Sequence, residues 1–219
     1  MSGRLAATLA RRPLPRLVGL VAVALALALV PLTLTSDHWG ERANWAVLGP
    51  LLGLSFVGAG LFAWERQRGL RVGALMVAVG VCALVAQLEV ADADLLFTVG
   101  LAFDGVYVAL VAHLLLAYPD GRLRSRGHRG LAAGAYAVCG LNLPVLAVAD
   151  PARAIPACAC PQKLLLVQRD DGLHELLHDV QQLTGALLAC AVVLVLVRRF
   201  RRPGGRERPP SPPCSSRVR

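Results

Sequence analysis

The chain has 219 residues, of which 56% are hydrophobic and only 17% are charged. This balance excludes a disordered chain and disfavours an ordinary soluble domain. The 23 Lys and Arg residues outnumber the 14 Asp and Glu residues, which gives a formal net charge of +9. Such an excess can indicate a nucleic-acid binder, but no basic stripe is interleaved with stacking aromatic residues, so we expect no nucleic-acid partner.

Six apolar segments are long enough to cross the ~30 Å hydrocarbon layer of a bilayer as helices, which need about 20 residues each. A helix suits this environment because it satisfies its own backbone donors and acceptors. The predicted spans are residues 17–34, 45–64, 72–88, 95–118, 130–149 and 179–197. They predict an all-α, polytopic membrane bundle of six transmembrane helices that occupies residues 17–197.

The basic residues gather on one side of these predicted spans. Nineteen of the 23 lie in residues 1–16, in the loops after the second and fourth spans, and in residues 198–219. The positive-inside rule therefore predicts that both termini are cytoplasmic and that the protein resides in the cell membrane. The same residues can hold anionic lipid headgroups. Residues 198–219 are rich in Pro, Ser and Arg and lack apolar periodicity, so we predict a disordered tail.

Small residues four positions apart mark faces where membrane helices approach closely. Gly49 with Gly53, and Gly130 with Gly134, have this spacing. Simple tolerance of glycine in membrane helices explains the same pattern equally well. Pro144 predicts a kink in the fifth span, because proline cannot donate the hydrogen bond that a continuous helix needs there.

Asp104 is the one acid well inside a predicted span, where a charge costs ~3 kcal/mol or more unless it is neutralised or partnered. We therefore expect its side chain to face the bundle interior. His113 follows nine residues later, which at 100° per residue places it on the opposite helix face. Gln87 in the third span is the expected partner of Asp104. Asp104, Gln87 and His113 are candidates for sensing a signal, and the alternative is a packing role through hydrogen bonds.

The long predicted outer segment contains a pattern typical of zinc-binding proteins. His174, Glu175 and His178 form H-E-x-x-H, in which two histidines share a helix face and the glutamate activates water. A second interpretation combines these histidines with Cys158 and Cys160 as a four-ligand zinc site, although the cysteine spacing is shorter than usual. A metalloprotease is disfavoured because no third ligand follows before the last span.

Oxidation is another interpretation of Cys158 and Cys160, because disulfides persist outside the cytoplasm. A bond between them would close a small, strained ring. The favoured interpretation leaves two unlinked thiols beside an interfacial amphipathic helix from Leu164 to Leu177. We accordingly expect no cofactor, with zinc as the alternative.

A tight turn follows the fourth predicted span, at Pro119, Asp120, Gly121 and Arg122. Proline ends the helix, Asp-Gly suits a reversal of chain direction, and the arginines that follow hold the loop inside the cell. A structural anchor that fixes topology explains these residues, and a role in transmitting a signal is the alternative.

The sequence around this turn, residues 113–126, resembles a signature in the membrane input regions of two-component sensor histidine kinases from high-GC Gram-positive bacteria. The resemblance covers about residues 45–197. It includes an Arg-rich loop like residues 66–71 before a Val-Gly-Ala-Leu opening, and an outer segment like residues 158–161. It implies a signal-input module that works as a homodimer or with a partner kinase chain.

Such kinases continue into a phosphoacceptor segment and an ATP-binding domain, whereas this sequence continues into the basic residues 198–219. No phosphate-binding glycine motif is present, so we expect no kinase activity and no enzyme. The alternatives are a zinc-dependent membrane protein or metalloprotease that uses His174, Glu175 and His178, and a truncated product without function.

Overall fold

The computed structural model describes residues 13–36, 42–66, 71–148, 161 and 164–201, and these ranges contain helices and no strand. The predicted all-α fold is therefore confirmed for this part of the chain. The elements are α2 (Pro13–Thr35), α3 (Arg42–Arg66), α4 (Arg71–Ala86), the 3-10 helix η1 (Gln87–Val90), α5 (Asp94–Ala117), α6 (Arg126–Gly140), α7 (Asn142–Val148) and α9 (Asp171–Arg201).

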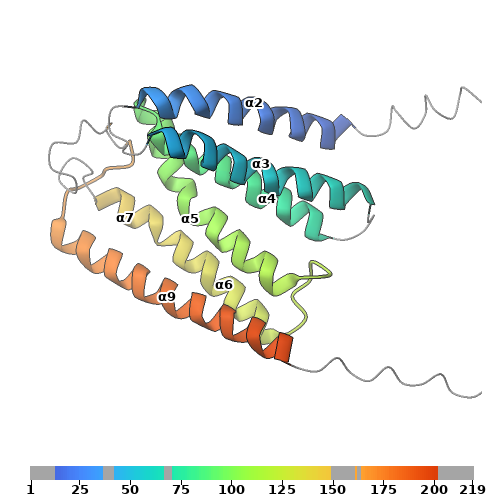
Figure 1. Ribbon diagram of the computed structural model, residues 1–219. Helices are drawn as coiled ribbons and strands as arrows, with labels where there is room; N and C mark the ends of the chain where they lie inside the picture. The colour runs from blue at the N-terminus through green and yellow to red at the C-terminus, as the bar shows by residue number, and fades with distance from the viewer. Residues whose placement is uncertain (1–12, 37–41, 67–70, 149–160, 162–163, 202–219) are drawn as a thin grey trace, which may run out of the picture.

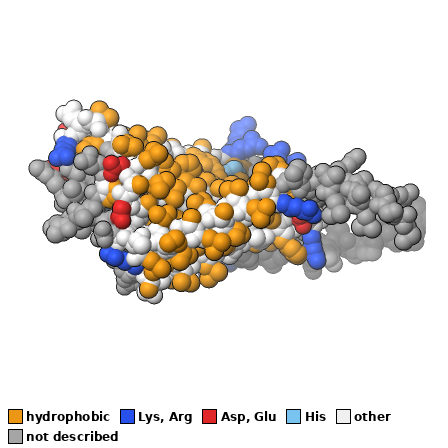
Figure 2. Space-filling view, turned by 90° about the horizontal axis from the view of Figure 1, so that it is seen from above, with side chains coloured by type: hydrophobic (Ala, Val, Ile, Leu, Met, Phe, Trp, Pro, Cys, Tyr) orange, Lys and Arg blue, Asp and Glu red, His pale blue; other side chains and the backbone are white. Residues whose placement is uncertain are grey.

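Six helical stretches in these ranges are long and apolar enough to cross a membrane, which confirms the predicted number. They are Leu14–Thr35, Arg42–Arg66, Arg71–Val90, Asp94–Ala117, Arg126–Val148 and Asp171–Arg199. Large apolar side chains are exposed around the bundle, among them Leu20 at 69% and Leu183 at 65%. Figure 2 shows hydrophobic side chains covering the middle of one face, with charged side chains toward its two ends. A surface of this kind indicates a membrane protein, because soluble proteins rarely expose contiguous apolar areas this large.

The helices form two groups that meet along α5. Helix α3 packs against α2 and most extensively against α4, while α5 contacts α4 on one side and α6 on the other. Helix α9 packs against α6, α7 and α5. Pro13 and Arg201, the first and last helical residues that the structure describes, lie at the same end of the bundle (Figure 1). The turn between α5 and α6 lies at that end, and residues 164–170 lie at the other (Figure 1).

Each group has its own apolar core. Leu29 of α2, Val57 of α3 and Leu84 of α4 are almost fully buried together in the first. The second core contains Leu116 of α5, Ala132 of α6 and Val192 of α9. It lies near the end of the bundle where α2 begins and α9 ends. The second core brings the last turns of α5 and α9 beside the start of α6.

Glycine allows α3 and α4 to approach closely. A Cβ atom added to Gly80 of α4 would lie 2.6 Å from the carbonyl oxygen of Gly53, and one added to Gly53 would lie 2.5 Å from Leu84. Gly53 therefore lies where two membrane helices approach closely, as the packing interpretation of the spacing expects, whereas the space beside Gly49 is occupied by the Gln87 side chain. The second pair differs: Gly134 faces Leu188 of α9, but a Cβ added to Gly130 would meet nothing within 4 Å.

Three predicted helix limits were wrong. The third span continues past residue 88 through η1, because 17 residues at 1.5 Å per residue fall short of the ~30 Å layer. Residues 166–170 have no regular secondary structure, so the predicted amphipathic helix from Leu164 to Leu177 does not form. Instead α9 begins at Asp171, after Asp170 caps its end by accepting a hydrogen bond from the Leu173 amide at 2.9 Å.

At its other end α9 continues to Arg201, four residues into the segment predicted to be a disordered tail. Arginines in the last turn favour this extension, because cationic side chains stabilise the carboxyl end of a helix. The rest of the predicted tail, residues 202–219, lies outside the described residues.

The kink predicted in the fifth span is a break between α6 and α7. Helix α6 ends at Gly140, four residues before Pro144, because the proline ring would clash with the Gly140 carbonyl group in a continuous helix. Asn142 at the break donates a hydrogen bond of 2.7 Å to the carbonyl oxygen of Leu101 on α5. This hydrogen bond gives the polar Asn142 side chain a partner inside the apolar span and joins the break to α5.

Candidate functional site

Asp104 lies on the side of α5 between its contact with η1 and its contact with α6. A Cβ added to Gly100 would collide with the backbone of Glu89 on η1, and one added to Gly105 would lie 3.4 Å from Sγ of Cys139 on α6. At 100° per residue, Asp104 falls between these two contact faces. Its side chain is exposed in the isolated chain. The expectation that it faces the interior was therefore wrong, because packing covers the faces beside it rather than its own.

Gln87 does not reach Asp104. Its side chain lies against Gly49 of α3, where an added Cβ would lie 2.6 Å from the amide carbon. The group near Asp104 is instead Glu89, a half-buried carboxylate on η1 within electrostatic range. Sequence reasoning missed this pair because it placed Glu89 in the outer loop. The shortness of the third predicted span was the signal that Glu89 belongs to it.

His113 joins α5 to α6. Its Nδ1 atom lies 3.0 Å from the hydroxyl oxygen of Tyr136, and the two rings meet edge to face with centroids 5.9 Å apart. His113 and Asp104 form no pair, as their helical spacing predicted. Tyr136 was not anticipated, although a phenol inside an apolar span needs a hydrogen-bond partner. This contact fits a packing role for His113.

His174 and His178 occupy the same face of the first turns of α9. Their ring centroids are 5.8 Å apart, as expected for residues four positions apart on a helix. The Nδ1 atom of His174 is buried and has no hydrogen-bond partner among the described residues. Glu175, between them, is exposed.

The other predicted zinc ligands, Cys158 and Cys160, lie outside the described residues. Within the residues that the structure does describe, no three His, Cys, Asp or Glu side chains gather as a metal site would require. The two histidines therefore form a pair of donors, whereas zinc sites usually have at least three protein ligands.

The turn after α5 is held against the start of α4 by Gly121. This glycine has φ of +70°, which favours glycine, and its amide donates a hydrogen bond of 2.9 Å to the Ala117 carbonyl oxygen. A Cβ added there would lie 2.6 Å from the Val72 amide nitrogen and 2.7 Å from Cβ of Arg71. The turn thus needs glycine both for its backbone conformation and for its contact with α4.

The same turn also contacts the end of α9 and the loop before α6. Arg199 donates a hydrogen bond of 2.5 Å from Nη1 to the Tyr118 carbonyl oxygen, 81 residues earlier in the chain. Asp120 forms an ion pair with Arg124. Ser125 caps α6 by accepting a hydrogen bond of 3.0 Å from the His128 amide. These contacts connect four helices at one end of the bundle.

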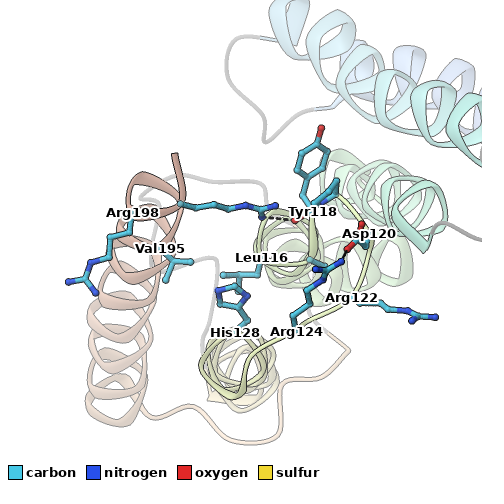
Figure 3. A pocket seen from close by; sticks show the side chains of 11 residues that line it. Leu116, Tyr118, Asp120, Arg122, Arg124, His128, Val195 and Arg198 are labelled. Atoms are coloured by element: carbon cyan, nitrogen blue, oxygen red, sulfur yellow. Dashed lines mark hydrogen bonds and ion pairs between the residues drawn. The ribbon is translucent and has the colours of Figure 1, made fainter. Parts of the chain in front are cut away.

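A cavity of about 490 Å³ lies between this turn and the adjoining ends of α5, α6 and α9. Figure 3 shows Leu116, His128 and Val195 directed toward its centre from these three helices, while Arg122 and Arg198 extend outward. The lining residues are Leu116, Ala117, Tyr118, Pro119, Asp120, Arg122, Arg124, His128, Val195, Arg198 and Arg199. Sequence analysis identified the turn and its positive charge, but the contributions of His128 and Val195 depend on tertiary packing.

No family model, curated protein or solved structure matches the chain. What the fold and the site define is therefore a class of architecture: a helical bundle of membrane type whose turn after α5 is packed against α4 and α9. The resemblance to sensor histidine kinases stays a prediction.

Proposed function

We propose that this protein is a signal-input module of the cell membrane that acts through a homodimer or a partner kinase chain. Both termini are cytoplasmic in this proposal, as the distribution of basic residues predicts. The observation that carries it is the hydrogen bond from Arg199 of α9 to the Tyr118 carbonyl oxygen at the turn. That bond joins the last helix to the part of the chain with the most specific family resemblance.

The length of α9 supports transmission of a signal from one side of the membrane to the other. Its 31 residues extend about 46 Å at 1.5 Å per residue, more than the hydrocarbon layer needs. The segment before α9 contacts other helices at the opposite end of the bundle. There the Leu164 amide donates to Thr98 Oγ1 at 3.1 Å, and the Val167 amide donates to the Ala147 carbonyl oxygen at 2.9 Å. A rigid helix can carry a displacement of this segment to the turn.

The side of α5 at Asp104, between η1 and α6, is the proposed place where a signal acts within the membrane. Asp104 lies well inside the apolar span of α5, where a charge is costly unless it is partnered, and Glu89 of η1 is within electrostatic range of it. A membrane-soluble cation or a proton would relieve that cost. A change of charge there would act on α5 where it packs against η1 and α6. Helix α5 leads directly to the turn, and both α5 and α6 contact α9.

Photo-crosslinking in the membranes of the native host tests the proposed partner. A benzophenone side chain would replace Val197 near the end of α9, and the matched control would replace Leu20 on α2, which is also exposed. We expect the 197 variant to form an adduct with a histidine kinase chain or a second copy of this protein, and the Leu20 variant to form none. Lipid adducts alone at both positions would contradict action through a partner chain.

A second proposal is a zinc-binding protein, which is favoured by the shared face of His174 and His178 and by the buried, unpartnered Nδ1 of His174. Cys158 and Cys160 would complete four ligands. Metal analysis of the detergent-purified chain tests this proposal beside a variant carrying His174→Ala and His178→Ala. One zinc per chain in the wild type and none in the variant would support it. No zinc in the wild type would exclude zinc binding and the metalloprotease alternative.

A further inference from the structure

The cavity beside the turn carries an excess of positive charge. Four arginines and His128 line it, and Asp120 is the single acidic residue among the lining residues. The Asp120 carboxylate is already paired with Arg124, and Arg199 is hydrogen-bonded to an uncharged carbonyl group. The remaining guanidinium charges are therefore not neutralised within the cavity lining. Arginine binds phosphate groups especially well because its planar donors match the phosphate oxygens.

The deeper wall of the cavity is apolar. Leu116 and Ala117 of α5 are buried, and Val195 of α9 is directed toward Leu116 (Figure 3). The cationic residues come from the ends of α9 and α6 and from the turn, one helical turn beyond this apolar wall. The ligand that fits this arrangement has a negative group and an adjoining apolar part.

The size and the place of the cavity also favour a lipid over a free ion. Its 490 Å³ compares with ~30 Å³ for a water molecule in the liquid, so it has room for a phosphate group with organic substituents. The cavity lies where the apolar spans α5 and α9 end, which is the depth of the headgroups in a bilayer. Basic residues immediately beyond a span attract anionic lipids.

We propose that this cavity binds the phosphate headgroup of one anionic phospholipid, with Arg199 and His128 beside the phosphate, Arg198 extending from the rim, and Leu116 and Val195 against the start of an acyl chain. Bound there, the lipid would bridge α9 and α6 beside the turn. This inference rests on the membrane placement in the proposed function, but not on the partner chain.

Lipid binding to the purified full-length chain tests this site. Native mass spectrometry in detergent would measure binding of dioleoyl phosphatidylglycerol, with dioleoyl phosphatidylcholine and inorganic phosphate as comparison ligands. The test variant carries Arg198→Gln and Arg199→Gln, since glutamine keeps a donor for the Tyr118 carbonyl group. The control carries Arg16→Gln and Arg126→Gln, which remove the same charge from exposed positions outside the cavity lining.

We expect phosphatidylglycerol to bind more tightly than phosphatidylcholine, and the test variant to lose about tenfold to thirtyfold in affinity, since each arginine near a membrane surface contributes several-fold. The control should stay within about twofold of the wild type, because its charges lie outside the site. Equal losses in both variants would overturn the proposal, since they would indicate only a general charge effect.

Two further results would overturn the lipid assignment or the site. If inorganic phosphate binds and phosphatidylglycerol does not, the ligand is a free phosphate and the lipid assignment is overturned. If the double variant fails to fold by circular dichroism, His128→Gln replaces it, and unchanged lipid selectivity in that variant would overturn the site. None of these outcomes depends on the partner chain, so crosslinking and lipid binding can fail separately.

Discussion

Gly121 is the residue whose backbone fixes the turn between α5 and α6. Its φ of +70° disfavours side chains, and the start of α4 occupies the space where a Cβ atom would lie. Replacement by any other residue therefore meets two independent costs, one from conformation and one from packing. The turn depends on this glycine more directly than on the charge of its arginines.

We predict that Gly121→Ala lowers the free energy of unfolding by about 2–4 kcal/mol. Alanine is strained in the left-handed backbone conformation of this position, and its Cβ atom would crowd Val72. Thermal unfolding in detergent would measure the loss. Gly130→Ala is the matched control, because an added Cβ there meets nothing within 4 Å. Equal melting temperatures for the two variants would contradict the proposed packing of the turn on α4.

Sequence periodicity placed the polar residues of the spans on helix faces, but not against neighbours. It correctly separated Asp104 from His113, because both lie on one helix of known pitch. It wrongly paired Asp104 with Gln87, since that pairing depends on how α4 is rotated against α5. Tertiary packing turned Gln87 toward Gly49 instead. Residue-scale predictions therefore succeeded within one helix and failed between helices.

The contact between α3 and α4 is the most extensive contact between two helices in the described bundle, and glycine makes it available. An added Cβ on Gly80 would lie 2.6 Å from the Gly53 carbonyl oxygen and 2.7 Å from the Val57 amide nitrogen. Both neighbours are backbone atoms, which cannot rotate away. A larger residue must push the helices apart.

At this scale we predict that Gly80→Ala destabilises the protein by about 1–3 kcal/mol, the usual cost of overpacking. Unfolding by sodium dodecyl sulfate, followed by circular dichroism, would measure it. Gly58→Ala on α3 provides the control, since no atom lies within 4 Å of its added Cβ. The packing account fails if Gly80→Ala is as stable as Gly58→Ala.

The hydrogen bond of Asn142 should stabilise the break between α6 and α7. Asn142→Ala removes the 2.7 Å hydrogen bond to the Leu101 carbonyl oxygen and should cost about 0.6–1.7 kcal/mol, the range for such bonds between membrane helices. The same denaturation assay would detect the change. Leu143→Ala at the adjacent, exposed position should have a smaller effect. The reverse order would mean that the hydrogen bond does not stabilise the break.

Hydropathy predicted the number of long apolar helices but not all their ends. Apolar runs identify the part of a helix that needs lipid, whereas caps and neighbouring charges decide how far the helix continues. Asp170 extends α9 toward residue 171 by capping, and the arginines near 201 favour its far end. His174 and His178 consequently belong to the last long helix rather than to a separate outer segment.

For the whole molecule, the even number of long helices places Pro13 and Arg201 at one end, together with the turn and the basic cavity (Figure 1). The sequence could predict that this end is basic, because the arginines lie in the segments that directly flank the predicted spans. The cavity could not be predicted, because it needs Val195 and His128 side by side. The signal-input role and the lipid ligand both depend on this end facing the cytoplasm.

The native cysteines allow that orientation to be measured directly. Cys158 and Cys160 lie in the predicted outer segment, and Cys214 lies in the predicted cytoplasmic tail. One variant would carry Cys158→Ser and Cys160→Ser, and another would carry Cys214→Ser. Each would be treated in intact cells with a membrane-impermeant maleimide, with and without permeabilisation, and Cys82, Cys139 and Cys190 would be replaced by alanine in both.

We predict that Cys158 and Cys160 react in intact cells, and that Cys214 reacts only after permeabilisation. Prior reduction would expose thiols held as a disulfide, so that oxidation is not mistaken for inaccessibility. Labelling of Cys214 in intact cells, with Cys158 and Cys160 protected until permeabilisation, would contradict the proposed orientation and with it the account of this protein as a signal-input module with cytoplasmic ends.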